Sequence, residues 1–253
     1  MSKKGKVTLV LTSCNRFDLL KLTIESFLKY NTYPIDKYIF IEDSDKIKSL
    51  EKVVYSFSEL KDKVILLHNP VNLGQLKSID RAYSFVETEY VFHCEEDWIF
   101  YRSGFIEDSI KVLESYPKVI NIWLRERTDT NHCKVLDTCE VFDKHKLYKF
   151  DLEDKKEPFS FTFNPCVKRI SDYEMIKGGY SKNGMEDVIS KFYEERGYYA
   201  VIFEKGYVRH EGWHRRVLAM EKKRSAIQKE ADALFKKYKA KVYKLIGIFG
   251  KGK

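Results

Sequence analysis

Residues 90–98 read YVFHCEEDW, and this stretch decides how the rest of the sequence is interpreted. A strand-forming run ends in three consecutive carboxylates, Glu95, Glu96 and Asp97. Adjacent negative charges at a strand end repel one another unless a cation neutralises them. Mg²⁺ and Mn²⁺ accept oxygen ligands, and open α/β sheets bind ligands beyond the carboxyl ends of their strands. The segment therefore indicates either a metal–diphosphate site or an acidic surface turn before a helix.

Strand-like and helix-like segments alternate on both sides of this stretch. We expect strands at 7–12, 38–41, 64–68, 90–94, 119–124 and 199–203, with short strands within 135–150. Helical spacing of apolar residues predicts helices at 19–30, 47–57, 76–86, 105–116, 172–176 and 188–196. Asp18 is the expected N-cap of the first helix, and most of 164–183 is expected to be loop. The β-α-β-α order predicts an α/β fold, a mainly parallel sheet flanked by helices.

The composition of the chain is that of a folded protein with a substantial core. Of 253 residues, 43% are apolar and 15% aromatic, which is enough for one large or two small domains. No apolar run approaches the roughly 18 residues of a membrane span, and no secretory signal is visible, so we expect a cytoplasmic protein. The five cysteines lack metal-site spacing and are expected to be reduced, although Cys133 and Cys139 could pair in an oxidising setting.

The net charge of +8 comes from the C-terminal part of the chain. From Arg215 onward there are 13 Lys and Arg against 3 Asp and Glu. Apolar residues recur at helical spacing through 227–249, so we expect a basic amphipathic helix in a tail of residues 216–253 that follows a domain of residues 1–215. Contact with an anionic membrane surface is favoured over docking of this helix on the domain. Nucleic acid is the weakest option, because no nucleic-acid motif accompanies the charge.

Five short segments, in order, resemble the family-2 type of GT-A glycosyltransferases. They are TSCNR at 12–16, IEDSD at 41–45, NLG at 72–74, EED at 95–97 and GMED at 184–187. The resemblance covers about residues 5 to 215. It implies a GT-A, Rossmann-like fold and an inverting, metal-dependent glycosyltransferase. Such an enzyme moves a sugar from a nucleoside-diphosphate sugar, with UDP favoured, to a hydroxyl of a glycan, lipid or protein-linked acceptor.

The resemblance also implies a metal site and a catalytic base. Asp97, assisted by Glu95 and by a late histidine, His210, would hold Mn²⁺ or Mg²⁺ against the two phosphates. His210 favours Mn²⁺, although a surface histidine is the alternative interpretation. Asp187 is the expected general base, with Glu186 orienting the acceptor or taking that role. Adjacent acids at a helix start are also ordinary caps.

Further residues are expected to hold the donor. Asp43 would accept a hydrogen bond from a uracil-like ring N–H, with Asn15 and Arg16 in the same pocket. The family's Ala-Arg-Asn is replaced here by residues 78–80, which leaves Lys77 or Arg81 as the phosphate contact. The complete expected donor set is Thr12, Asn15, Arg16, Asp43, Asn72, Gly74, Lys77, Glu96, Arg209 and Arg215. The side chains expected beside the acceptor cleft are Trp98, Trp123, Arg125 and Arg127.

Two other functions compete with glycosyl transfer. Nucleotidyltransferases also place acids at strand ends of an α/β sheet, but they usually carry a glycine-rich loop after the first strand, and residues 12–16 contain no glycine. A non-catalytic sugar- or membrane-binding module on the same fold is the third interpretation. The acidic motif and the acids at 186–187 favour the enzyme.

Overall fold

The computed structural model describes residues 4–60, 62–130, 133–152 and 159–212. Residues 1–216 form one compact unit and residues 217–253 a second. All described residues belong to the first unit. The helix expected at 227–249 and the donor contact expected from Arg215 lie outside the described residues.

A five-stranded sheet organises the unit, with strand order β3-β2-β1-β4-β9. Its four parallel strands are β1 (Val7–Ser13), β2 (Ile35–Glu42), β3 (Val64–His68) and β4 (Tyr90–Glu95). The fifth strand, β9 (Cys166–Arg169), pairs antiparallel with β4. The mainly parallel α/β sheet is thus confirmed. The loop expected at 164–183 is wrong in part, because pairing with β4 makes a strand of a segment too short to show a period of its own.

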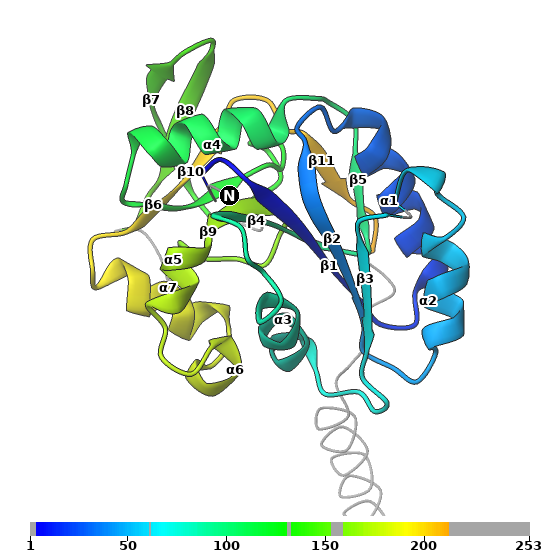
Figure 1. Cartoon of the computed structure of the whole chain (residues 1–253). Coiled ribbons are helices and arrows are strands. Elements are labelled where there is room, and N and C mark those ends of the chain that lie inside the picture. The colour runs from blue at the N-terminus through cyan, green and yellow to red at the C-terminus, as the bar shows by residue number, and fades with distance from the viewer. Residues whose placement is uncertain (1–3, 61, 131–132, 153–158, 213–253) are drawn as a thin grey trace, which may run out of the picture. The chain divides into compact units, whose positions relative to one another are not determined.

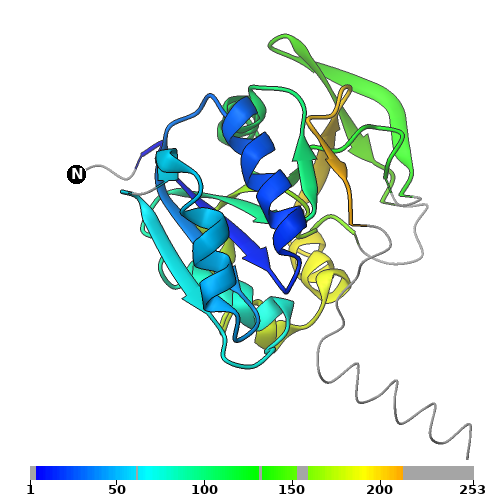
Figure 2. The ribbon, with the colours of Figure 1, turned by 90° about the vertical axis from the view of Figure 1, so that its right-hand side faces the viewer.

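Helices cover both faces of this sheet, as predicted (Figure 1). The helices α1 (Phe17–Tyr30), α2 (Ile47–Val54) and α4 (Phe105–Ser115) share one apolar core, and Figure 2 shows α1 and α2 over the sheet. The helices α3 (Gln75–Tyr83), α6 (Tyr180–Asn183) and α7 (Glu186–Glu194) form the other core. Side chains alternate along each strand. Leu9 therefore lies in the first core and Val10 in the second.

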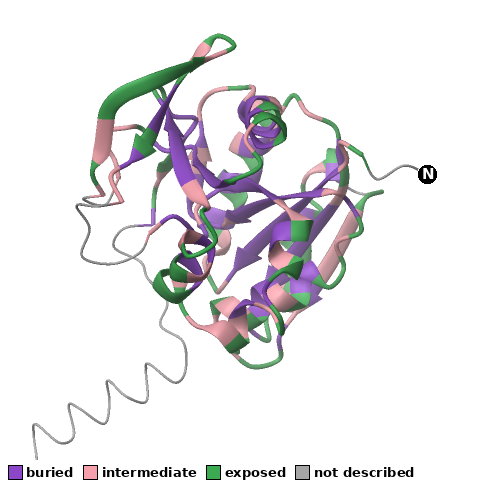
Figure 3. Cartoon of the chain, turned by 90° about the vertical axis from the view of Figure 1, so that its left-hand side faces the viewer, coloured by how far each residue is buried: buried purple, intermediate pink, exposed green. Residues whose placement is uncertain are grey.

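A second sheet has the order β6-β10-β8-β7. Its strands are β6 (Val119–Trp123), β7 (Val135–Phe142), β8 (His145–Phe150) and β10 (Tyr199–Phe203). One face packs against α4, and the other forms a small core around Trp123 and Phe150, whose ring centroids are 4.7 Å apart. The edge strand β7 is largely exposed, as the green hairpin in Figure 3 shows.

A two-stranded antiparallel pair completes the described fold. β5 (Trp98–Phe100) follows the acidic motif directly, and β11 (Val208–His210) pairs with it, so that His210 lies opposite Trp98. The segment before β11 includes Gly206, where a Cβ would lie 2.6 Å from the backbone nitrogen of Glu126, so only glycine fits there. This pairing carries the end of the unit back to the carboxyl end of β4.

Several local expectations need adjustment. Arg16 occupies the N-cap position of α1 and Asp18 lies in its first turn, so the predicted Asp18 cap is wrong. The short helix α5 spans Ile170–Glu174, two residues earlier than predicted, and a 3₁₀ turn spans Ser58–Leu60. All five cysteines are free thiols. No helix in the described ranges is long and apolar enough to cross a membrane.

Candidate active site

The acidic turn after β4 is held by a forked arginine from the first turn of the sheet. Arg16 Nε donates to Glu96 Oε1 at 2.8 Å, and Arg16 Nη1 donates to Asp97 Oδ2 at 2.7 Å. The backbone N–H of Cys14 also donates to Glu96 Oε1, at 3.0 Å. Glu96 and Asp97 are buried, at 3% and 5% exposure, so these contacts neutralise charges that water does not reach.

The environment shifts the pKa of each carboxyl group in the turn differently. Burial raises the pKa of Glu95 well above its ordinary value, and the charges of Asp97 and Glu96 raise it further. Burial also raises the pKa of Glu96, although Arg16 opposes this. For Asp97, burial is outweighed by the hydrogen bond from His210 and the charge of Arg16, so its pKa is lowered. Asp97 is therefore the carboxylate most firmly held in its charged form.

The strand β11 brings His210 onto Asp97. His210 Nε2 lies 3.1 Å from Asp97 Oδ2, and the imidazole packs on Trp98 with ring centroids 4.8 Å apart. The backbone N–H of Glu211 donates to the Asp97 carbonyl oxygen at 2.8 Å. At the next residue, Gly212, a Cβ would lie only 2.1 Å from Asp97 Oδ2. The expected pair of Asp97 and His210 is thus brought together in space.

These residues fit a divalent cation. Asp97 Oδ1 is buried and has no hydrogen-bond partner among the residues that the structure describes, although a buried carboxylate oxygen is normally satisfied. A carboxylate and an imidazole are a donor pair suited to Mn²⁺. Within the described part of the chain, no three His, Cys, Asp or Glu side chains form a ready-made metal cluster. Oxygens of water or of a phosphate would therefore have to complete the coordination.

Glu42 fixes the turn that follows β1. Its buried carboxylate accepts hydrogen bonds from the Ser13 hydroxyl at 2.5 Å, the Asn15 backbone N–H at 2.8 Å and the Ser44 hydroxyl at 2.6 Å. Asn15 has φ of +59°, a left-handed conformation that asparagine tolerates better than most residues. Sequence reasoning gave Glu42 no role, because two of its three partners, Ser13 and Asn15, lie at the end of the neighbouring strand β1, 29 and 27 positions away in the chain.

Asp43 organises the loop after β3. Its Oδ1 accepts hydrogen bonds from Asn69 Nδ2 and the Leu73 backbone N–H, and its Oδ2 accepts one from the Gly74 backbone N–H, each at 2.8 Å. Asn72 Nδ2 donates to the Asp43 carbonyl oxygen at 3.3 Å. Asp43, Asn72 and Gly74, three residues of the predicted donor set, therefore lie in contact. In this state the Asp43 carboxylate bonds the loop, and its predicted contact with a base stays a prediction.

The two acids at the start of α7 differ in their surroundings. Glu186 Oε1 accepts a hydrogen bond from the Phe163 backbone N–H at 2.6 Å, and its charge contributes to raising the pKa of Glu95. Asp187 is exposed in the first turn of the helix. Glu186 thus lies within electrostatic reach of the acidic turn, and Asp187 is open to solvent.

The remaining predicted residues lie in different places. Thr12 is buried at the end of β1, where it pairs with Glu95 of β4. Lys77 is exposed on α3, and the exposed Arg209 forms an ion pair with Glu211 at 3.5 Å. The side chains buried instead of bordering a cleft are Trp98, Trp123 and Arg125, at 2%, 3% and 2% exposure.

Two more residues contribute to the site without a sequence signal. Gln75 Nε2 donates to Glu95 Oε1 at 2.7 Å, so the first residue of α3 contacts the acidic turn. Asp80, in place of the last residue of the family's Ala-Arg-Asn, accepts hydrogen bonds from the backbone N–H groups of Tyr180 and Ser181, both at 2.8 Å. It therefore joins α3 to α6, just before the 184–187 motif.

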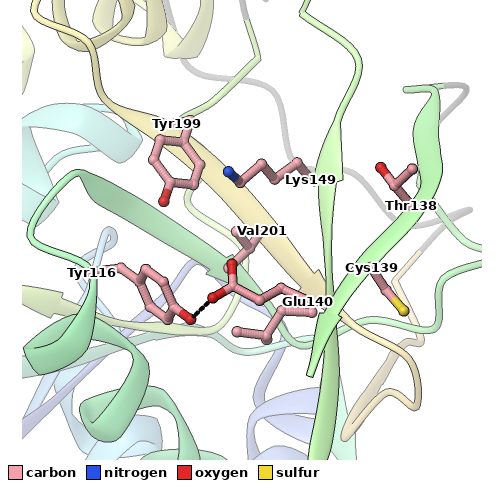
Figure 4. A pocket seen from close by; sticks show the side chains of 8 residues that line it. Tyr116, Thr138, Cys139, Glu140, Lys149, Tyr199 and Val201 are labelled. Atoms are coloured by element: carbon pink, nitrogen blue, oxygen red, sulfur yellow. Dashed lines mark hydrogen bonds between the residues drawn. The ribbon is translucent and has the colours of Figure 1, made fainter. Parts of the chain in front are cut away.

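A cavity of about 190 Å³ lies on the second sheet, away from all the candidate residues. It lies between the end of α4 and strands β7, β8 and β10, and Tyr116 hydrogen-bonds to Glu140 across it (Figure 4). Its lining consists of Tyr116, Thr138, Cys139, Glu140, Leu147, Lys149, Tyr199 and Val201. The candidate site is thus defined by converging strand ends and not by this cavity.

The model of the glycosyl transferase family 2 matches residues 8–174. The chain belongs to glycosyl transferase family 2. The match includes the turn after β1, the loop after β3 and the acidic turn, and it ends before the 184–187 motif and β11. No curated protein matches the chain.

Solved structures of glycosyltransferases share the fold. A TarS fragment from S. aureus in complex with UDP-GlcNAc has a TM-score of 0.58 at 14% identity, covering 84% of this chain and 62% of its own. The mannosyltransferase PcManGT from Pyrobaculum calidifontis, in complex with GDP-Man and Mn²⁺, has a TM-score of 0.57 at 13% identity, with coverages of 80% and 57%. The GT-A fold is therefore confirmed. The chain spans about three-fifths of the length of these structures.

Proposed function

We propose that this chain is a metal-dependent, inverting glycosyltransferase that uses a nucleoside-diphosphate sugar, with UDP favoured. The observation that carries the proposal is the contact of Asp97 with His210, beside a buried carboxylate oxygen that has no hydrogen-bond partner within residues 4–60, 62–130, 133–152 and 159–212. That similar folds hold UDP-GlcNAc, or GDP-Man with Mn²⁺, supports a nucleotide-sugar donor and a divalent ion. The acceptor would be a hydroxyl of a glycan, a lipid or a protein-linked sugar.

Each group at the site has a distinct part in this reaction. A divalent cation held by Asp97 and His210 would supply Lewis-acid stabilisation of the leaving diphosphate. The acceptor oxygen forms a bond to the anomeric carbon, and the bond from that carbon to phosphate oxygen breaks, with its electron pair leaving on the diphosphate. The hydroxyl proton passes to Asp187 as general base. Attack opposite to the leaving group inverts the anomeric configuration.

Asp187 and Glu186 divide the acceptor side between them. Asp187 is exposed and can reach a hydroxyl that approaches from solvent. The Glu186 carboxylate already accepts a backbone hydrogen bond, which suits a role in fixing the start of α7 or in orienting the acceptor. Burial raises the pKa of Glu95, and the charges of Asp97 and Glu186 raise it further, so Glu95 is coupled electrostatically to a proposed metal ligand and to the start of α7.

Substitution of one acid at the proposed metal site, and of another at the position of the proposed general base, tests the proposal. Release of nucleoside diphosphate from UDP-Glc, UDP-GlcNAc, UDP-Gal and GDP-Man would be measured with Mn²⁺, Mg²⁺ or EDTA. Asp97→Asn is expected to lose Mn²⁺-dependent donor binding together with turnover. Asp187→Asn should keep donor binding and lose about 10²–10⁴-fold in turnover. Asp36→Asn, at an exposed ion pair with Lys6, is the matched control.

The outcomes separate the competing functions. Full turnover in both Asp97→Asn and Asp187→Asn would contradict the catalytic assignment. Formation of pyrophosphate from a nucleoside triphosphate, in place of nucleoside diphosphate release, would identify a nucleotidyltransferase. NMR of the anomeric proton in the product distinguishes inversion from retention.

The sequence of the tail supports a peripheral position on an anionic membrane face of the cytoplasm. Seven lysines and no acids occur between residues 233 and 253. Basic residues near an anionic surface each contribute about 1 kcal/mol to binding. This placement would suit a lipid-linked acceptor.

A further inference from the structure

Arg16 lies where a cation is expected, between the two buried carboxylates of the acidic turn. Its guanidinium contacts Glu96 through Nε at 2.8 Å and Asp97 through Nη1 at 2.7 Å. We propose that Arg16 is the counter-ion of the acidic turn in the metal-free site and sets its affinity for divalent cations. The proposal rests on the proposed metal use. A divalent cation held by Asp97 would compete with Arg16 Nη1 for this carboxylate.

The backbone around Arg16 is arranged to aim this side chain at the turn. The preceding Asn15 has φ of +59°, and Glu42 holds its N–H, so the chain reverses direction between β1 and α1. Arg16 itself occupies the N-cap position of α1, where Ser, Thr, Asp or Asn would cap the helix, yet it makes no side-chain cap. Its side chain contacts residues 80 and 81 positions away instead. The N-cap position of α1 therefore has no capping side chain, and its residue instead supplies a positive charge to the acidic turn.

Arg16, His210 and a divalent cation would compete for the carboxylate of Asp97. Oδ2 of Asp97 is shared by Arg16 Nη1 and His210 Nε2, whereas Oδ1 has no hydrogen-bond partner in the described part of the chain. A buried carboxylate that loses a strong counter-charge is destabilised, and a new cation is then bound more tightly. Arg16 therefore stabilises the acidic turn before a divalent ion binds and, by the same contact, weakens the binding of that ion.

One arm of the fork can remain attached while the other is released. Glu96 Oε1 accepts from Cys14 N–H and from Arg16 Nε, so this end is held from two sides. Release of Nη1 from Asp97 would leave its N–H donors close to the metal site. A guanidinium suits phosphate oxygens because its donors form a planar fork. The same displacement would thus turn Arg16 from a counter-ion of Asp97 into a contact for the diphosphate.

Mn²⁺ alone, without nucleotide, tests this inference. Binding would be measured on the full chain by titration calorimetry and by the EPR signal of free Mn²⁺. Arg16→Gln is expected to bind Mn²⁺ about tenfold or more tightly than wild type. Arg16→Lys, which keeps the charge without the fork, should lie between them. Lys21→Gln removes an exposed positive charge from the same helix and should match wild type.

The readout distinguishes this inference from a general structural role and from the proposed function. Damage to the fold weakens metal binding, whereas the inference requires it to become tighter. If Arg16→Gln does not fold without metal, the comparison of Arg16→Lys with wild type decides the result. Equal Mn²⁺ affinities for wild type and both Arg16 variants would overturn the inference alone. If Asp97→Asn binds Mn²⁺ as wild type does, or if wild type binds none, the proposed metal site itself is wrong.

Discussion

At the scale of single residues, Asp80 fixes the start of α6, which comes just before the proposed catalytic base in the sequence. Its carboxylate accepts two backbone N–H bonds from the start of α6, at 2.8 Å each, and the Tyr173 hydroxyl at 3.0 Å. At Gly179 a Cβ would lie 2.7 Å from this carboxylate, so the close approach requires glycine. Asp80, which stands in place of the asparagine of the family's Ala-Arg-Asn, thus makes a structural contact in this chain.

Asp80→Ala is therefore expected to destabilise the fold. Loss of hydrogen bonds to a charged acceptor should lower the free energy of unfolding by about 2–4 kcal/mol, measured by urea denaturation. Asp36→Ala removes an exposed aspartate and should cost less than about 1 kcal/mol. Equal, small costs for both variants would show that Asp80 does not hold α6.

His93 is a buried histidine that should make stability depend on pH. It is fully buried against the rings of Tyr83 and Phe163, and neither ring nitrogen has a hydrogen-bond partner among the described residues. Burial, and secondarily the charge of Lys168, lowers its pKa well below the ordinary value. The folded protein then binds fewer protons than the unfolded chain below about pH 6.5, so stability falls as pH falls.

Replacement of His93 by Phe should remove this part of the pH dependence. In wild type, one such group contributes a loss of up to about 1.4 kcal/mol per pH unit below its unfolded pKa. Urea unfolding at pH 7.5 and 5.5 would measure the difference. His68→Phe, at a half-exposed histidine of β3, is the control and should keep the wild-type difference. An unchanged pH dependence in His93→Phe would contradict the assignment.

The positions of the candidate-site residues were predictable from sequence where a motif follows a strand. The contacts of these residues with one another were not. The segments at 12–16, 41–45, 72–74 and 95–97 do converge, because parallel strands end at one edge of a sheet. Which side chain faces which partner depends on contacts between strands. The forked contact of Arg16 with the acidic turn has no counterpart in local sequence.

At the scale of elements, the pair β5–β11 completes the candidate site. β11 places His210 opposite Trp98, and the following Gly212 approaches Asp97 more closely than a side chain allows. A Cβ at Gly212 would lie 2.1 Å from Asp97 Oδ2, so the carboxylate would have to move.

Gly212→Ala should impair the metal site more than the fold. We expect Mn²⁺ affinity and turnover to fall by about tenfold or more, since small displacements of a catalytic group are costly. Gly197→Ala is the control: it adds a Cβ at φ of +76° with nothing within 4 Å, so its cost is one of backbone strain. Gly197→Ala should lower Tm while Mn²⁺ affinity stays at the wild-type value. A loss of Mn²⁺ affinity in Gly197→Ala but not in Gly212→Ala would exclude a role for Gly212 at Asp97.

Elements with a strong local pattern were predicted well, and elements made by distant pairing were not. The strands at 64–68 and 199–203 agree with their predicted bounds, because continuous apolar runs mark them. β5 and β9 are three and four residues long. Their strand structure depends on partners far along the chain.

At the scale of the whole molecule, a buried lysine joins the two sheets. Lys168 of β9 donates to Asn121 Oδ1 of β6 and to the Thr162 carbonyl oxygen, both at 2.8 Å, and lies 4.0 Å from the centre of the Phe161 ring. The five-stranded sheet and the second sheet are thereby linked through one buried side chain.

The basic tail should determine where the protein resides. Deletion of residues 233–253 is expected to abolish sedimentation with anionic liposomes and to leave binding to neutral liposomes unchanged. The full chain in high salt is the second comparison, because salt screens lysine charges. Unchanged sedimentation of the truncated chain would contradict the membrane proposal.

The dependence of Asp97 on His210 has a consequence for biosynthesis. A ribosome adds about 5–20 residues per second, so the nascent chain carries the carboxylates for roughly 6 to 23 s before the histidine is even polymerised. Throughout that interval the emerging polypeptide would lack one member of the proposed pair of metal ligands. Donor turnover would therefore switch on only once nearly the entire domain has left the exit tunnel.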